Sequence, residues 1–346
     1  MDNIDKRNFI KGIAAVTVCM ALLSGIPYLV YILANAASEE AVYAYSPGYS
    51  DDSAYSEPAE DSLKPLERII IGDGGAELSP EEYIERAVLG SLPPDAEPEL
   101  IKAQSVLVYT FLLGQNQSKG ENGTLIIKSE QLNRQFTYLA TEAELEAAYG
   151  GDEAEKGLEE FYSAVRDAVK ATKGEYLSFE GVPILPAYCY SSGGVTESAE
   201  DIIGESLPYL KSVESLEDSE YITEAVYTSD ELFSIFAMAE SPITLEGDPS
   251  DWIKILDITG TGYVKLAKVG EYSYFTGAEL SKMLSLPSAR FEISYSSELD
   301  RFSFRVSGSG GLMGLSHYGA NKMAGEGMSY KELLLYFFPG TSIDVF

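Results

Sequence analysis

The stretch PELIKAQSVLVYTFLL, residues 98–113, does most to define the architecture of this 346-residue chain. Its apolar side chains recur at helical spacing, which predicts an amphipathic helix that begins near Pro98 and buries one face. The residues predicted on that face are Leu100, Ile101, Leu107, Val108, Phe111 and Leu112. A chain of this length buries a sizeable core, so we expect the helix to pack against several other elements.

Capping signals predict two more helices. Ser79 as N-cap, Pro80 at the first position and a Glu that completes a capping box start one of them. Ser329 and Glu332 form a second capping box, and the helix that follows stops at Pro339. Both helices therefore have defined starts.

Periodicity predicts the remaining elements. Residues 153–171 form an amphipathic helix ended by Gly174, with Leu158, Phe161, Val165 and Val169 on one side. The predicted strands are ERIIIGDGG (67–75), a hairpin in YLSFEGVPILPAYCY (176–190) with its turn at Glu180-Gly181, and WIKILDIT, YVKLAKV, RFEISYS and RFSFRVSG within 252–310, where TGAELSKML adds one helix. Helices early and strands late predict an α+β fold with mixed sheets and packed helices.

An uncharged run from Gly12 to residue 37 is long enough to cross a hydrocarbon core of about 30 Å as a helix. Basic residues precede it and acidic residues follow it, so the positive-inside rule predicts a cytoplasmic segment 1–11, a single-pass anchor 12–37 and an extracytoplasmic remainder. A cleaved signal peptide with Ala34-Asn-Ala36 as its cleavage site is the alternative, but the run exceeds a typical signal-peptide core. Residues 38–65 mix Ser, Asp, Glu, Pro and Tyr, which predicts an acidic, flexible tether.

The composition excludes several classes of partner. The formal net charge of −31 argues against nucleic acid, because phosphate binding needs clustered Lys and Arg. The chain has two cysteines, Cys19 and Cys189, and one histidine, His317, so no zinc site and no disulfide outside the membrane segment are expected. No metal or other cofactor is predicted.

A second stretch, AYCYSSGGVTES (187–198), crowds small hydroxyl side chains around a Gly-Gly pair, directly after an apolar run. Glycine permits positive φ and a close approach of another backbone or a ligand. The pattern by itself fits either a strand-to-loop turn or one wall of a binding groove.

Three separated segments together resemble the stage II sporulation protein D family of membrane-anchored peptidoglycan lytic transglycosylases. They are PELIKAQSVLVYTFLL (98–113), the hydroxyl-rich stretch extended through TESAEDIIGESLPYLKSV (196–213), and GLMGLSHYGANKMAGEGMSYKELLLYFFPGTSI (311–343). FTGAELSKMLSLPSARFEI (275–293) is similar to a further segment of the family. The resemblance covers about residues 66–343, so residues 66–346 are expected to form one catalytic domain.

The resemblance implies that Glu99 is the catalytic residue of a lytic transglycosylase. Such a Glu protonates the glycosidic oxygen and then takes the proton of the C6 hydroxyl that attacks C1, which leaves a 1,6-anhydro sugar. The residues that the resemblance places at the substrate are Gln104, Tyr109, Tyr188, Tyr190, Ser191, Ser192, Gly193, Gly194, Thr196, Ser316, His317 and Tyr318. The implied partners are peptidoglycan glycan strands stripped of stem peptides during septal remodelling, a cell-wall amidase and other sporulation membrane proteins.

The chain departs from the family pattern around the predicted site. Tyr109 stands where the family has Arg, Tyr190 and Gly311 where it has His, His317 where it has Gln, and Ile203 where it has Trp. These departures support an alternative, a catalytically weak glycan-binding scaffold that recruits or regulates the amidase. A serine hydrolase using Ser191 or Ser192 with His317 is a third possibility, although neither Ser lies in a G-x-S-x-G elbow.

Overall fold

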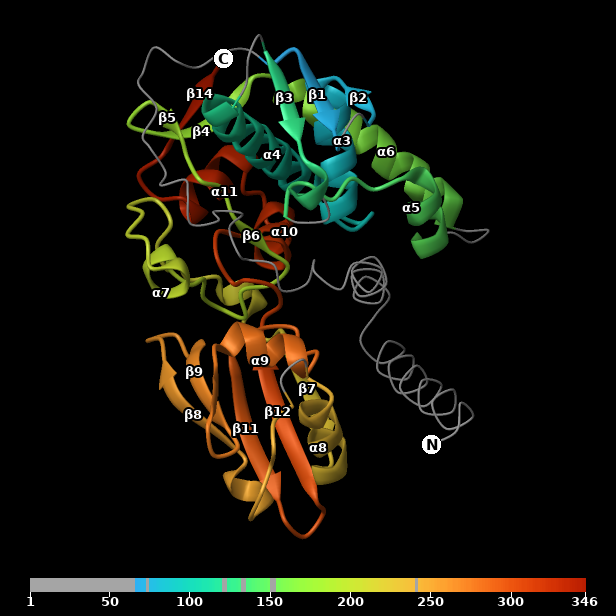
Figure 1. Ribbon diagram of the computed structural model, residues 1–346. Helices are drawn as coiled ribbons and strands as arrows, with labels where there is room; N and C mark the ends of the chain where they lie inside the picture. The colour runs from blue at the N-terminus through green and yellow to red at the C-terminus, as the bar shows by residue number, and fades with distance from the viewer. Residues whose placement is uncertain (1–65, 73–74, 120–122, 132–134, 150–153, 240–241) are drawn as a thin grey trace.

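The computed structural model describes residues 66–346 apart from 73–74, 120–122, 132–134, 150–153 and 240–241 (Figure 1). The predicted cytoplasmic segment, anchor and tether in residues 1–65 lie outside the described residues. Within the described part of the chain, no helix is both long and apolar enough to cross a membrane.

Helix α4 (Pro98–Lys119) is the centre of the first of two lobes. Around it pack α3 (Pro80–Ser91), α6 (Ala154–Ala171), α10 (His317–Gly325) and α11 (Tyr330–Phe337) (Figure 1). The prediction of one buried face is wrong for this helix, because neighbours surround it and also bury Ala103, Gln104, Ser105, Val106 and Thr110. The hydroxyl of Thr110 donates to Val106 O at 2.7 Å, which satisfies it inside the core.

Short sheets frame this helical core. β1 (Arg68–Ile71) lies between β2 (Glu77–Leu78) and β3 (Thr124–Ile127), while β4 (Glu175–Phe179) lies between β14 (Ser342–Val345) and β5 (Val182–Pro183). The predicted hairpin is confirmed, since β4 and β5 pair antiparallel around a turn with positive φ at Glu180 and Gly181. Helices α5 (Glu142–Tyr149) and α7 (Ala199–Ile203) complete this lobe.

The second lobe is built mainly from strands. One antiparallel sheet has the order β10 (Ser273–Phe275), β9 (Val264–Val269), β8 (Ile253–Ile258), and the other has β11 (Phe291–Ser296), β12 (Arg301–Ser307), β7 (Ile222–Tyr227). Helices α8 (Ser229–Ala237) and α9 (Gly277–Met283) pack on these sheets (Figure 1). Its core contains Phe236, Trp252, Phe302 and Phe304 and is separate from the core around α4.

The mixed α+β composition is confirmed, with several small sheets and nine α-helices in the described residues. The capping boxes predicted at Ser79 and Ser329 are both present. Ile202 and Leu312 of the first lobe pack against Tyr263 and Ala289 of the second, so the lobes touch directly.

Candidate functional site

The Ser-Ser-Gly-Gly loop, residues 191–194, lies where two of the sequence motifs meet. It follows β6 (Tyr188–Cys189), which runs parallel to β13 (Leu315–Ser316). Gly193 has φ of 65°, and a Cβ on it would lie 2.6 Å from the backbone nitrogen of Gly308. Glycine is therefore required there both by conformation and by the close approach of the chain entering from β12.

Buried Asp218 holds this loop through its carboxylate. It accepts hydrogen bonds from the backbone N–H of Ser192 at 2.7 Å and of Gly194 at 2.8 Å. It also accepts from the hydroxyls of Ser191, Ser192 and Ser316. All three serines are fully buried, so the predicted groove-wall hydroxyls point into the protein and fix the shape of the loop.

Arg290 holds the same loop from its other side. Its guanidinium donates to Ser192 O at 2.7 Å and to Val195 O at 2.9 Å, and it forms an ion pair with Glu197. The Glu197 carboxylate also accepts from the Thr261 hydroxyl. Arg290 lies between α9 and β11, so a residue of the second lobe reaches into the first.

His317 is buried at the start of α10 and belongs to a stacked group. Its ring lies on Tyr188 with 4.5 Å between centroids, and Phe136 meets Tyr188 edge-on. His317 Nε2 lies 3.0 Å from Oε1 of Gln104 on α4. Burial lowers the pKa of His317 to about 3, so the imidazole is neutral at physiological pH.

The geometry speaks against the serine-hydrolase interpretation. The hydroxyls of Ser191 and Ser192 donate to Asp218, while Nε2 of His317 is paired with Gln104. A nucleophile must share a hydrogen bond with its base, and these side chains are directed to other partners.

Two further predicted site residues lie apart from the loop's hydrogen bonds. Burial raises the pKa of Tyr109 on α4, with Glu81 and Tyr176 adding to the shift, which places it near those two residues. Thr196 is buried, and its hydroxyl accepts from Val213 N at 2.8 Å. The structure does not bring Tyr109 together with Tyr190 and Tyr318.

Three half-buried tyrosines form what we call the tyrosine platform: Tyr190, Tyr221 and Tyr318. Their ring centroids lie 5.6 to 6.4 Å apart, and the ammonium of Lys322 lies 4.7 Å from the Tyr318 ring. Burial raises the pKa of Tyr190 to about 12, and the carboxylate of Asp95 and Tyr318 add to this. Partly exposed aromatic rings with polar tips suit contact with sugar faces and hydroxyls.

Glu99 lies in the first turn of α4 and is held as a carboxylate. Its Oε1 accepts from Lys102 Nζ at 2.6 Å, and its Oε2 accepts from the backbone N–H of Tyr330, the first residue of α11, at 2.8 Å. Partial burial raises the pKa of Glu99, but the two hydrogen bonds and the Lys102 charge together lower it below the ordinary value. The carboxyl is therefore ionised at neutral pH.

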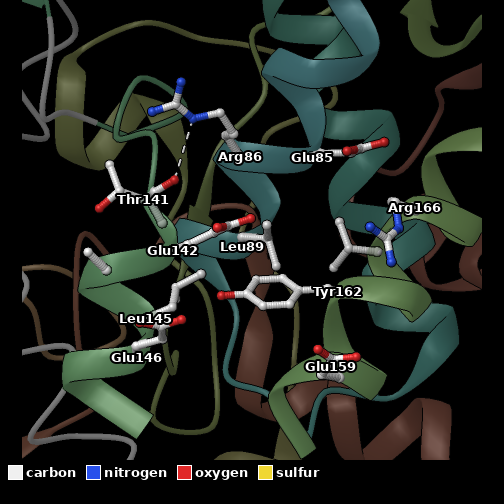
Figure 2. Close-up of a pocket in the computed structure, with 13 residues that line it drawn as sticks. Glu85, Arg86, Leu89, Thr141, Glu142, Leu145, Glu146, Glu159, Tyr162 and Arg166 are labelled. Atoms are coloured by element: carbon white, nitrogen blue, oxygen red, sulfur yellow. Dashed lines mark hydrogen bonds between the residues drawn. The ribbon is translucent and has the colours of Figure 1, made fainter. Parts of the chain in front are cut away.

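A cavity of about 810 Å³ lies between α3, α5 and α6 (Figure 2). Its lining combines carboxylates and guanidiniums around Tyr162, and the charged residues are Glu85, Glu142, Glu146, Glu159, Arg86 and Arg166. None of the predicted site residues lines it, so this cavity is separate from the tyrosine platform and from Glu99.

In the described residues no group of three or more His, Cys, Asp and Glu side chains is arranged to hold a metal ion. Burial raises the pKa of the Cys189 thiol, which keeps it protonated and unsuited to act as a ligand or nucleophile.

Sequence reasoning missed Asp218, Arg290 and Tyr221, which approach the loop from distant positions in the chain. No local pattern marks an Asp or Arg that meets its partner only after folding. Glu197 lies in the stretch TES (196–198) that follows the glycines, but the sequence did not indicate its ion pair with Arg290.

Comparisons with known proteins show which proteins the sequence resembles. A family model described as Stage II sporulation protein matches residues 75–179, which include Glu99 and Gln104. The chain is 28% identical over 273 residues to Stage II sporulation protein D of Bacillus subtilis (strain 168), covering 76% of this chain and 74% of that protein. The corresponding protein of Bacillus amyloliquefaciens is 26% identical over 269 residues, with the same shares.

A more distant relative is the Amidase enhancer of Bacillus subtilis (strain 168), 24% identical over 229 residues, or 52% of this chain and 32% of that protein. The family match covers the helices α3, α4, α5 and α6, and the relatives extend the similarity over most of the chain. Residues 75–179 thus match the stage II sporulation protein family, and the chain is similar to Stage II sporulation protein D over most of its length.

Proposed function

We propose that this protein acts in cell-wall remodelling during sporulation by binding peptidoglycan glycan strands on the tyrosine platform, with weak or no lytic transglycosylase activity of its own. Similarity to this family supports the sporulation role. Three adjacent, partly exposed tyrosines beside Lys322 offer ring faces and hydroxyls to a sugar chain.

We propose glycan binding in preference to catalysis because Glu99 is ionised. A general acid must hold its proton near neutral pH until it transfers it to the leaving oxygen. Here Lys102 and the N–H of Tyr330 both stabilise the carboxylate, which opposes that role. The carboxylate contributes instead to joining α4 and the N-terminus of α11.

Lytic transglycosylation is the second candidate, because Glu99 is retained within the matched region 75–179. In this reaction Glu99 would give its proton to the oxygen leaving C1 of N-acetylmuramic acid. It would then accept the proton of that sugar's C6 hydroxyl as its oxygen bonds to C1. A bound strand would have to displace Lys102 and remove water from the carboxyl before Glu99 gained that proton.

We further propose a membrane-anchored, extracytoplasmic location and a cell-wall amidase as partner. The uncharged run 12–37 supports the anchor. The relative named Amidase enhancer supports the partner. In this arrangement the tyrosine platform would hold a glycan strand from which the amidase has already removed the stem peptides.

The deciding experiment uses the full chain in detergent micelles with peptide-stripped and intact glycan strands. Affinity is measured by calorimetry, and 1,6-anhydro products are sought by mass spectrometry. We expect binding without product, and a loss of up to about tenfold in affinity for Tyr318→Ala. Tyr272→Ala is the matched control, since this tyrosine is 80% exposed and lies in the second lobe.

Glu99→Gln separates the two candidates, with Glu160→Gln as control because that exposed Glu also pairs with a Lys on its own helix. Extensive conversion of the glycan to product by the wild type, lost only in Glu99→Gln, would establish the transglycosylase and refute the weak-activity proposal. Absence of glycan binding by the wild type would refute both.

A further inference from the structure

We propose that Arg290 and Asp218 form a clamp on the loop 191–194 and the adjoining Val195, and that this clamp makes them positioning residues for the tyrosine platform. The inference rests on the proposed glycan-binding function and deepens it. Neither residue belongs to the α4 core: Arg290 comes from the second lobe, and Asp218 from the short helix Leu216–Asp218 at the joint between the lobes.

The two residues divide the loop's hydrogen bonds by type. The carboxylate of Asp218 accepts hydrogen bonds from the N–H groups of Ser192 and Gly194. The guanidinium of Arg290 donates hydrogen bonds to the carbonyl oxygens of Ser192 and Val195. Donors and acceptors of one turn are thus satisfied from opposite sides, which fixes the loop in one conformation.

The clamp is sealed from water. Asp218 and Glu197 are fully buried, and the side chain of Arg290 is 9% exposed. Glu197 neutralises Arg290, so the guanidinium is buried as part of an ion pair. Only the planar fork of Arg reaches two carbonyls and a carboxylate at once; a Lys keeps the charge but loses this geometry.

Each tyrosine of the platform is attached to this clamp through the backbone. Tyr190 immediately precedes the loop, and its carbonyl accepts from Tyr318 N at 2.8 Å. The N–H of Tyr221 donates to Asp218 O at 3.0 Å, and its carbonyl accepts from Gly308 N at 3.0 Å. A change in the loop therefore shifts the rings relative to one another.

The test compares three variants of the full chain in detergent micelles. Arg290→Lys retains the charge, and Arg290→Met with Glu197→Met removes both charges of the buried ion pair. Phe302→Leu is the control, because it weakens the second core without touching the clamp. Amide exchange of Ser192 and Gly194, affinity for peptide-stripped glycan, and the thermal midpoint are measured for each.

In Arg290→Lys and in the double variant, the amide hydrogens of Ser192 and Gly194 should exchange faster. Both variants should bind glycan roughly tenfold more weakly. Phe302→Leu should lower the thermal midpoint while leaving exchange and affinity near wild-type values. Unchanged exchange and affinity in Arg290→Lys would overturn the clamp, as would a Phe302→Leu variant that loses affinity equally.

Failure of the glycan-binding proposal has a different signature. If the wild type binds no glycan, that function is refuted, and the exchange of the two loop amides alone decides the clamp. Faster exchange in Arg290→Lys then supports it, and unchanged exchange overturns it.

Discussion

A carboxylate in the first turn of a helix is ionised unless burial outweighs its charged and dipolar neighbours. Glu99 shows which effect prevails in this fold. Its partial burial raises the pKa, but Lys102 and the N–H of Tyr330 lower it by more. Retention of one motif residue therefore does not establish that its chemistry is retained, since the pKa depends on what folding places beside it.

His317 provides a prediction at the same scale. Its pKa is lowered from 6.5 to about 3 by burial, so between these values the unfolded chain binds a proton that the folded protein excludes. Stability from this residue is complete above pH 6.5 and is lost as pH falls. We expect the free energy of unfolding of wild type to fall relative to His317→Gln by up to about 1.4 kcal/mol per pH unit in this window.

Urea denaturation of the two proteins at several pH values checks this. The acidic residues are common to both, so their contributions cancel in the difference. Parallel pH dependences for wild type and His317→Gln would show that His317 titrates normally in the folded protein.

At the scale of elements, the short parallel pair β6 and β13 decides where the motifs meet. Gly314 directly precedes β13 with φ of 71°, and a Cβ there would lie 2.1 Å from Ala187 O. Any side chain would push β13 away from β6 and so separate Ser316 from Asp218.

Gly314→Ala should therefore cost about 3 kcal/mol or more of unfolding free energy. Gly204→Ala is the matched control, because Gly204 has φ of 75° but no atom within 4 Å of an added Cβ. It should lose only the cost of the left-handed conformation, about 1 to 2 kcal/mol. Equal losses in urea denaturation would show that the contact with Ala187 is not limiting.

The whole molecule has two hydrophobic cores, and the two lobes that contain them touch directly. The second core contains Trp252, the single tryptophan of the chain, which stacks on Phe302 with centroids 6.1 Å apart. Its fluorescence therefore follows the unfolding of the second lobe. Far-UV circular dichroism follows mainly the first lobe, because most of the helices in the described residues lie there.

Because Arg290 links the lobes, both signals should give one coincident unfolding transition in wild type. In Arg290→Lys we expect the two transitions to separate as the lobes unfold more independently. Separate transitions already present in wild type would show that the joint does not couple the lobes.

Local signals in the sequence predict the local elements. Capping boxes at Ser79 and Ser329, the turn at Glu180-Gly181 and the apolar period of residues 153–171 were all confirmed, because each depends on neighbours within a few residues. The spacing of three motifs also indicated the family.

The roles of the site residues depend instead on contacts between distant segments. The sequence predicted that the hydroxyls of Ser191, Ser192 and Ser316 contact a sugar. In the structure these hydroxyls donate hydrogen bonds to Asp218, which lies far away in the sequence. Segments far apart in the chain likewise bury α4 on all sides. They also bring Arg290 to its hydrogen bonds with the loop. Charge state and exposure are set by such long-range neighbours, and a local pattern of residues does not contain them.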